Sequence, residues 1–514
     1  MIIERTNNTI RNTIWGFVNK LVMIIFPFII RTIIIRSLGA EYSGIHSLFV
    51  SIVSMLGLAE LGFDTAMVYS MYQPLANGDD STIRALLKFY KTVYRVIGAV
   101  ILIIGFFLLP FLPKLINGSV PDDINVYLLY GIYLFNTVSS YWLFAYKNSV
   151  LIALQRNDVS INISTVCNFL MYIVQIALLT CTKNYYFYVL WMPVCSISIN
   201  LLTARYTSKH YPKYYCEGDL SKNKIEEIKK QVFGLFSQRL ALTSRNAFDS
   251  IILSTFFGLI VVGIYNNYFY ILNAISAVLA ILFISMQSGI GNSVVVETVE
   301  KNIKDFHKIH FLYMLIAGWC SICFFVMVQP FMQIWVGEKL MFSLKIAGIL
   351  SFYFYSTKMT DTVNAYLSAT GLWWKCKYTY LFEALVNLIL NIILSKLFGV
   401  IGIIVATLIS VLFINYLCTL VVLCKYYFGR YEFKVYLIKE LKCLVSTVIV
   451  GVILWILLTN LNITNLYISL AIRILACFTI APCLYLLIYH KNPEAVESVY
   501  WLLPNIKKFI KRNN

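Results

Sequence analysis

Long apolar runs separated by short polar connections fill almost the whole of this 514-residue sequence. A helix needs about 20 apolar residues to cross the hydrocarbon core of a bilayer. Scanned at that length, the sequence predicts fourteen transmembrane spans. Their approximate ranges are 12–35, 42–71, 94–113, 124–146, 157–180, 186–204, 231–257, 261–290, 309–328, 346–368, 379–395, 399–424, 443–459 and 466–489. The pattern therefore predicts an all-α polytopic membrane protein.

Composition supports this fold class and argues against several functional classes. The chain is 60% hydrophobic and 13% charged, whereas a soluble domain is about one-quarter charged. The net charge of +18 comes from short basic clusters between the spans, so a nucleic-acid partner is not expected. Most of the 12 cysteines fall inside apolar spans without a CxxC pair, which is typical of small apolar residues. We expect no metal site and no cofactor.

Lysine and arginine predict the orientation. Most of the 42 Lys and Arg residues lie in alternate connections, on the same side as the N-terminus, including 84–95, 205–230 and 425–442. Basic connections stay in the cytoplasm, so both termini should be cytoplasmic and the protein should lie in the cell (inner or cytoplasmic) membrane. No signal-peptide cleavage site is visible, and the first span should be retained. Short outer connections disfavour a glycosyltransferase or polymerase, and the lack of a GxxxxGK[ST] loop disfavours an ATP-driven pump.

The two halves of the sequence repeat each other at an almost constant offset. The matched pairs are Gly44 and Gly263, Pro110 and Pro330, and Asn148 and Asn364, which are 219, 220 and 216 residues apart. The offset equals six spans, an even number, so both halves should cross the membrane in the same direction. This predicts two parallel six-helix lobes around a central cavity, plus two extra C-terminal helices.

The repeat also predicts how the chain is divided. An N-lobe, a basic cytoplasmic linker, a C-lobe, the two extra spans and a cytoplasmic tail should follow one another. Their expected ranges are 1–208, 209–230, 231–427, 428–490 and 491–514. In the tail, apolar residues stand beside lysines, which favours an amphipathic helix lying on the anionic inner leaflet.

Several polar residues inside spans 1 and 7 are candidates for binding an anionic substrate. They are Lys20, Arg31, Arg239, Arg245 and Asn246. Lys20 and Arg31 are eleven residues apart and should share a helical face, and Arg239 should share its face with Asn246. Arg245 lies one turn before Asp249, which could pair with it. An ionisable residue inside a membrane suggests function, and the alternative is that these cations snorkel to the interface or pair structurally.

The stretch LAELGFDTA, residues 58–66, places Glu60 and Asp64 one helical turn apart within the second span. One interpretation is a proton or sodium site that couples transport to an ion gradient, to which Asp249 could contribute. Another is a gate in which the acids pair with Lys20 or Arg31. A third is that the acids are structural and reached by water near the end of the span. All three stay open.

An HxxH motif, His307 and His310, opens the ninth span. A metal site needs further ligands, and no third ligand lies close in the sequence. The motif therefore favours two histidines at a basic membrane interface.

Four motifs carry a family likeness: RNTIWGF (11–17), LGAEYSGIHSL (38–48), LAELGFDTAMV (58–68) and PLANGD (74–79). They resemble the polysaccharide-transporter family of Wzx-type lipid-linked oligosaccharide flippases, from the superfamily that includes multidrug and toxin exporters and lipid II flippases. The resemblance implies outward transport of an undecaprenyl-diphosphate-linked repeat unit by alternating access, for capsule, O-antigen or a related surface polysaccharide. It implies membrane lipids, a polysaccharide polymerase and export machinery as partners.

The negative charge of such a substrate matches the positive residues inside the spans. A diphosphate needs arginine or lysine to meet it, so we expect Lys20, Arg31 and Arg239 to line the cavity, with Arg245 as a further candidate if Asp249 does not claim it. No catalytic residue is expected, because the protein should be a transporter and not an enzyme. The alternative is a cation-coupled small-molecule antiporter of the multidrug type with the same architecture.

Overall fold

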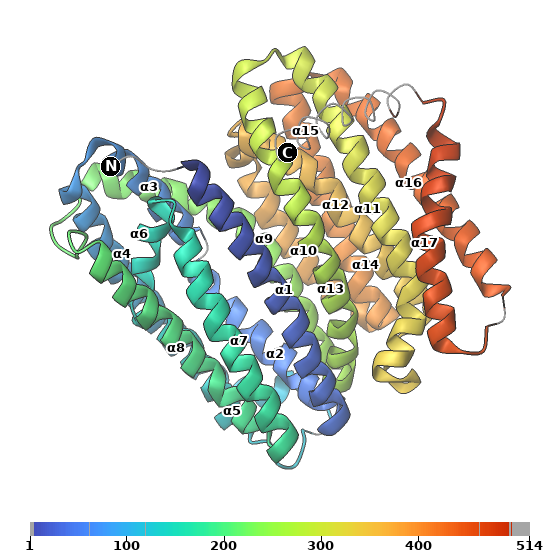
Figure 1. The fold of residues 1–514 in the computed structure, drawn as a ribbon, viewed down its shortest axis with the longest axis horizontal. Helices are drawn as coiled ribbons and strands as arrows, with labels where there is room; N and C mark the ends of the chain where they lie inside the picture. Colours follow the sequence, from blue (N-terminus) through green and yellow to red (C-terminus); the bar gives the residue numbers. More distant parts are fainter. Residues whose placement is uncertain (1–4, 61, 119, 462, 493–494, 496–514) are drawn as a thin grey trace. The chain divides into compact units, whose positions relative to one another are not determined.

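The computed structural model describes residues 5–60, 62–118, 120–461, 463–492 and 495. All regular secondary structure in these residues is helical, as the sequence predicts (Figure 1). Contacts divide the chain into two compact units, Met1–Asn266 and Asn267–Asn514. The predicted lobes, linker and extra spans have other boundaries, which stay predictions. Most of the predicted tail lies outside the described residues.

The first unit contains long helices that pack in pairs. In chain order its helices are α1 (Arg5–Ser37), α2 (Ala40–Leu56), α3 (Phe63–Asn77), α4 (Asp80–Leu108), α5 (Val126–Trp142), α6 (Asn148–Ala153), α7 (Asn157–Thr182), α8 (Tyr185–His210) and α9 (Lys222–Phe257), followed by the start of α10 (Leu259–Val296). Helices α1, α7 and α8 lie side by side (Figure 1), while α2 and α3 pack on α9. Helix α9, which carries the predicted seventh span, therefore packs within the first unit.

The second unit is organised around α11. After the end of α10 it contains α11 (Val299–Val336), α12 (Leu344–Ala369), α13 (Lys377–Phe398), α14 (Val400–Ile409), α15 (Leu417–Leu423), α16 (Arg430–Thr459) and α17 (Leu466–Tyr489). A π-helical segment, Ser410–Tyr416, joins α14 to α15. Helices α12, α16 and α17 all pack against α11. The predicted extra spans, on α16 and α17, are thus packed directly onto α11.

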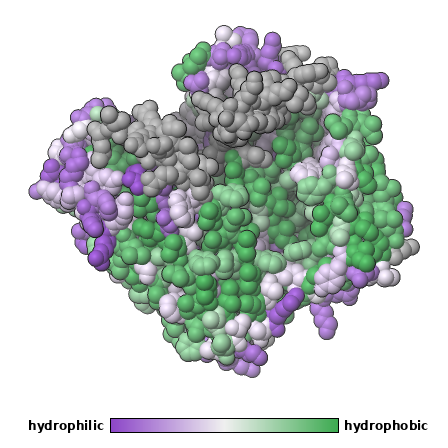
Figure 2. Space-filling model, in the orientation of Figure 1, coloured by the Kyte–Doolittle hydropathy of each residue, from purple (hydrophilic) through white to green (hydrophobic). Residues whose placement is uncertain are grey.

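Most predicted spans coincide with helices that suit a bilayer. Among the described residues, 10 helical segments are long and apolar enough to cross a membrane, and each coincides with one predicted span. The other predicted spans lie on α2 and α3, α5, α9 and α12. Large apolar side chains such as Phe107 and Leu487 are exposed. Figure 2 shows broad hydrophobic areas on the face that it draws. The chain is a multi-pass membrane protein.

The predicted span 42–71 is not one continuous helix. Helix α2 stops before Gly57 and α3 starts after Gly62, with a 3₁₀ turn between them. Gly62 has a φ of 85°, in the left-handed region that glycine adopts without steric cost. The prediction that Glu60 and Asp64 lie one turn apart on a single helix is therefore wrong, because glycines interrupt the run.

Two glycines of the sequence repeat pack against each other in the first unit. A Cβ atom added to Gly263 of α10 would lie 3.4 Å from the backbone nitrogen of Gly44 in α2, and one added to Gly44 would lie 2.6 Å from the carbonyl carbon of Leu259. Small residues allow helix backbones to approach this closely. Each helix also follows a glycine at positive φ, Gly39 at 125° and Gly258 at 84°. The repeated pattern thus marks a helix crossing.

The connection between α8 and α9 is tied to the start of α4. The ion pairs are Lys213–Asp80 at 2.9 Å, Arg84–Glu217 at 3.2 Å and Lys88–Asp219 at 2.9 Å. Exposed pairs contribute about 0–1 kcal/mol each, so they fix the path of the connection more than they stabilise the fold. Asp79 caps α4, and hydrogen bonds from Ser81 and Thr82 lower the pKa of Asp79 to about 2.

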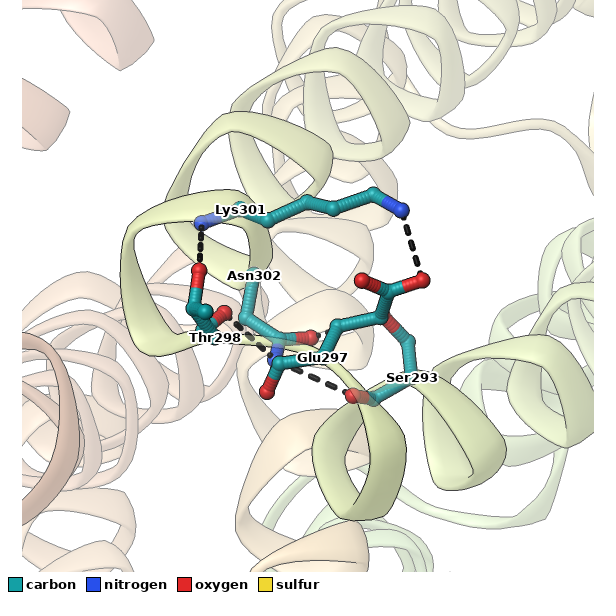
Figure 3. Close-up of polar contacts among 5 residues, drawn as sticks. All are labelled: Ser293, Glu297, Thr298, Lys301 and Asn302. Atoms are coloured by element: carbon teal, nitrogen blue, oxygen red, sulfur yellow. Dashed lines mark hydrogen bonds and ion pairs between the residues drawn. The ribbon is translucent and has the colours of Figure 1, made fainter.

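A hydrogen-bonded corner joins α10 to α11 (Figure 3). The Thr298 hydroxyl accepts from the backbone N–H of Lys301 at 3.4 Å and caps α11. The Nδ2 of Asn302 donates to the carbonyl of Ser293 at 3.1 Å, and Lys301 pairs with Glu297 at 2.6 Å. Side chains thus satisfy backbone groups that the helix ends leave open, and the chain passes between the two long helices without a long loop.

Candidate functional site

Glu60 lies among tyrosine hydroxyls in the first unit. The hydroxyl of Tyr141 on α5 donates to its Oε2 at 2.6 Å, and the hydroxyl of Tyr94 on α4 donates to its Oε1. Hydrogen bonds to a charged acceptor are about twice as strong as neutral ones. Because Glu60 belongs to the 3₁₀ turn that interrupts the second span, the interruption directs this carboxylate toward α4 and α5.

Asp64 joins the same network through a further tyrosine. The hydroxyl of Tyr90 donates to Asp64 Oδ1 at 2.8 Å, and the hydroxyl oxygens of Tyr90 and Tyr94 are 2.9 Å apart. Two tyrosines therefore bridge the carboxylates of Asp64 and Glu60, which both line a cavity of about 260 Å³. Other polar residues lining this cavity are Ser140, Asn148, Ser160, Asn200 and Thr203. The arrangement suits a cation or water, and a gating or coupling role for the acids stays a prediction.

Arg239 and Asn246 lie on an exposed face of α9. They share this face as their seven-residue spacing predicts. A guanidinium N–H of Arg239 donates to the hydroxyl of Thr65 on α3 at 3.0 Å. Thr65 follows Asp64 in the sequence. The exposed Arg239 of α9 therefore contacts the residue next to an acid of the Glu60 and Asp64 network.

Arg245 and Asp249 lie on the packed side of α9. Arg245 is 7% exposed and Asp249 is 1% exposed. The hydroxyl of Tyr265 on α10 donates to Asp249 Oδ2 at 2.7 Å. A buried charge needs hydrogen-bonding partners. Both residues therefore contribute to the packing of α9 in the first unit. On α9, Arg239 and Asn246 are more accessible to a substrate than Arg245.

The first span places its two cations in different surroundings. Lys20 is exposed on α1. Arg31 is partly buried and donates to the carbonyl of Gly263 at 3.2 Å. This carbonyl belongs to the glycine crossing of α2 and α10. Arg31 therefore supports that crossing, while Lys20 presents its ammonium group at the surface.

The second unit contains a buried polar stripe on α13. Glu383, Asn387 and Asn391 are spaced four residues apart on α13 and are all buried. The Nδ2 of Asn415 donates to Glu383 Oε2 at 2.6 Å, and the Nδ2 of Asn387 donates to Ser410 Oγ at 3.1 Å. Both partners belong to the π-helical segment. The four-residue spacing is the signal that could have found this stripe.

His310 of the HxxH motif is buried, at 3% exposed, and the membrane interface expected for the two histidines stays a prediction. Its Nε2 contacts the carboxylate of Glu440 on α16, 130 residues away in the sequence. His307, one turn earlier on α11, pairs with Glu432 at 3.0 Å. No local pattern could have shown these partners, because they lie on a distant helix.

The fold is similar to that of several helical membrane proteins of known structure. The lipid II flippase MurJ in an inward closed conformation superposes with a TM-score of 0.67 at 14% identity, covering 93% of this chain and 98% of MurJ. An inward-facing multidrug resistance MATE family transporter of the MOP superfamily gives 0.58 at 14% identity, covering 78% and 97%. A MATE transporter from Vibrio cholerae gives 0.54 at 12% identity, covering 81% and 95%. At these identities the likeness establishes the fold.

The family follows from the sequence itself. Residues 9–285 match the family described as "Polysaccharide biosynthesis protein". This match covers more than half of the chain, so the chain belongs to that family. Among curated proteins, none matches the sequence. The resemblance inferred from RNTIWGF and LAELGFDTA is confirmed, and both motifs lie inside the matched region.

Proposed function

We propose that this protein is a flippase that moves an undecaprenyl-diphosphate-linked oligosaccharide repeat unit from the cytoplasmic to the outer leaflet. Its family and its MurJ-like fold support a transporter without catalytic chemistry. The observation that carries the proposal is Arg239, an exposed guanidinium within a predicted span. An arginine inside a membrane span is costly unless it faces water or an anionic partner, and guanidinium binds phosphate oxygens through parallel N–H groups.

In this proposal each candidate residue has a role that its surroundings allow. Arg239 and Lys20 bind the diphosphate, and Asn246 donates to a phosphate or sugar oxygen. Arg31 and Arg245 support these groups from the packed side. The Glu60 and Asp64 network changes its hydrogen bonds as access alternates between the two sides of the membrane. Both termini lie in the cytoplasm. The repeat unit is released on the outer side of the membrane, where a polymerase and export machinery would use it.

Arg239→Ala tests the proposal in proteoliposomes that contain a fluorescently labelled polyprenyl-diphosphate disaccharide. One hydrogen bond to a charged group contributes about 1.5–3 kcal/mol, so we expect flipping to slow about tenfold or more. Arg239→Lys should be intermediate, because an ammonium group cannot form the paired N–H contacts. Arg205→Ala removes another exposed arginine, on α8, and should flip at the normal rate. A normal rate in Arg239→Ala would overturn the assignment.

A second function has support from the acidic cavity. Organic cations bind to carboxylates and aromatic rings, and the cavity beside Glu60 is lined by both. This observation favours a cation-coupled small-molecule antiporter of the multidrug type. Proton-driven uptake of a cationic dye by the same proteoliposomes, without flipping of the lipid probe, would establish it in place of the flippase.

A further inference from the structure

His310 is the centre of a buried polar cluster in the second unit. The Nε2 of its ring contacts the carboxylate of Glu440 on α16, and both residues are 3% exposed. Its Nδ1 lies 2.6 Å from the hydroxyl of Thr362 on α12 and 3.0 Å from the hydroxyl of Tyr436 on α16. The two ring nitrogens therefore have partners of different chemistry.

The carboxylate fixes one of these nitrogens. The hydroxyl of Tyr355 on α12 donates to Glu440 Oε1 at 3.0 Å, while Oε2 faces His310. An ionised carboxylate can only accept hydrogen bonds. When Glu440 is ionised, the Nε2 of His310 therefore carries a hydrogen and donates it to Glu440. A proton that binds and leaves the ring must then do so at Nδ1.

The partners of Nδ1 allow this exchange. A hydroxyl can either donate or accept a hydrogen bond. When His310 is neutral, the hydroxyl of Thr362 or Tyr436 donates to Nδ1. When His310 is an imidazolium, Nδ1–H donates to the same hydroxyl oxygen. The site can thus hold or release one proton without losing its hydrogen bond at Nδ1.

A cavity lined in part by polar side chains borders this ring. The cavity has a volume of about 440 Å³ and is lined by His307, His310, Lys439, Lys442 and Asn492. It has room and polar partners for water, which can carry a proton to the ring. The titratable groups around the ring are His307 of α11, Tyr355 of α12, Tyr416 of the π-helical segment, Glu432, Tyr436, Lys439, Glu440, Lys442 and Cys443 of α16, and Tyr489 of α17. Among the described residues, Glu440 is the acid that contacts the ring.

We propose that the His310–Glu440 pair is a proton-binding site, with the exchanged proton on His310 Nδ1, and that this proton couples to transport. The imidazolium makes a stronger hydrogen bond to Glu440 than the neutral ring does, so protonation tightens the attachment of α16 to α11 and α12. Helix α16, which lies outside the predicted repeat, thereby acquires a role in the transport cycle. The coupling rests on the proposed flippase function, whereas the proton binding does not.

Nitrogen-15 NMR of the full-length protein in nanodiscs, labelled on its 5 histidines, tests proton binding without a substrate. His310→Gln identifies the His310 signals, and substitution of the other four histidines identifies them by elimination if that variant misfolds. We expect Nδ1 to change from imine to protonated type between about pH 9 and about pH 5 while Nε2 stays protonated. No change at Nδ1 over this range, or loss of the Nε2 hydrogen, would overturn the proposal.

Glu440→Gln removes the negative charge but keeps the shape of the side chain. We expect proton binding at His310 to weaken about tenfold or more, because an adjacent opposite charge favours the protonated form. Glu432→Gln is the matched control, since it removes the acid that pairs with His307 one turn away. It should leave the His310 signals unchanged. Equal effects of the two substitutions on His310 would overturn the specific role of Glu440.

Transport of the fluorescent polyprenyl-diphosphate probe tests the coupling. Wild-type protein should flip it faster when a pH gradient is imposed across the vesicle. His310→Gln and Glu440→Gln should flip it at the rate seen without a gradient, and Glu432→Gln should respond as the wild type does. A full gradient response in Glu440→Gln would overturn the coupling. Failure of the wild type to flip the probe would overturn the flippase function instead, and the NMR titration would still decide the proton site.

Discussion

Replacing Gly44 by alanine tests whether the crossing of α2 and α10 is a tight backbone contact. The new Cβ atom would lie 2.6 Å from the carbonyl carbon of Leu259 and 3.1 Å from its Cα. Real Cβ atoms essentially never come within 3.0 Å of such atoms. The carbonyl cannot rotate away, because Leu259 begins α10. The two helices must therefore move apart to admit the methyl group.

Two opposing terms set the size of the effect. Alanine is favoured over glycine in a helix interior by about 1 kcal/mol. Overpacking costs about 1–3 kcal/mol, and a clash with the backbone of α10 belongs at the upper end. We therefore expect Gly44→Ala to lower the free energy of unfolding of the first unit by about 2 kcal/mol.

Gly131 offers a matched control on α5. It also lies inside a helix, but a Cβ added there has no heavy atom within 4 Å. Gly131→Ala should therefore raise stability by about 0.5–1 kcal/mol. The same substitution thus has opposite expected signs at two helical positions, and the difference comes from packing alone.

Thermal unfolding followed with a thiol-reactive dye measures this difference. Cys195 of α8 is buried in the first unit and becomes reactive when the unit opens. We expect Gly44→Ala to unfold at a lower temperature than the wild type, and Gly131→Ala at the same or a higher temperature. Gly263→Ala should resemble Gly44→Ala, since its Cβ would lie 2.8 Å from the carbonyl oxygen of Ala40. If Gly44→Ala proved as stable as Gly131→Ala, the helices would not be in backbone contact.

Three further expectations concern the first unit. Tyr141→Phe removes one hydroxyl donor from Glu60 and should lower the free energy of unfolding by about 1.5–3 kcal/mol in chemical denaturation, whereas Tyr127→Phe, exposed on the same helix, should have little effect. Glu60→Gln should slow flipping of the fluorescent lipid if the carboxylate acts as a gate, and an unchanged rate would assign Glu60 to structure. Asp79 must be ionised to cap α4 at full strength. Because its pKa falls to about 2 in the folded protein from about 4 when unfolded, its contribution is present above about pH 4 and is lost as the pH falls toward 2. Hydrogen exchange at the start of α4 should report this loss in the wild type, and Asp79→Asn should abolish the pH dependence.

Hydropathy was enough to predict the helical fold because the membrane leaves the backbone little choice. Without water, every lipid-exposed N–H and C=O group must be satisfied inside its own helix, so an apolar run of sufficient length becomes a helix. The break at Gly62 was not predicted, since the apolar run continues through it. The location of the break depends on a left-handed glycine and on the tyrosine hydroxyls that donate to Glu60. These hydroxyls lie on other helices, α4 and α5.

The candidate site was predictable in its charges but not in its neutral partners. Glu60, Asp64 and Arg239 stand out in a sequence where charge is rare. The hydroxyls that hold the acids belong to three of 36 tyrosines, and nothing local distinguishes these three from the rest. Their function depends on which helices pack together. A single sequence does not contain that information, because hydroxyl contacts over long sequence distances leave no periodic pattern.

Burial changes how the charged residues inside the spans should be interpreted. Asp249, Glu383 and Glu440 are buried and accept hydrogen bonds from neighbouring helices. Such contacts offset the cost of removing a charge from water. Packing therefore explains why these acids are present, unless the site can also exchange a proton. Lys20 and Arg239 are exposed instead. An exposed cation within a span needs water or an anionic ligand near it. The case for substrate binding therefore depends on these two cations, whereas ion coupling is to be sought among the buried acids.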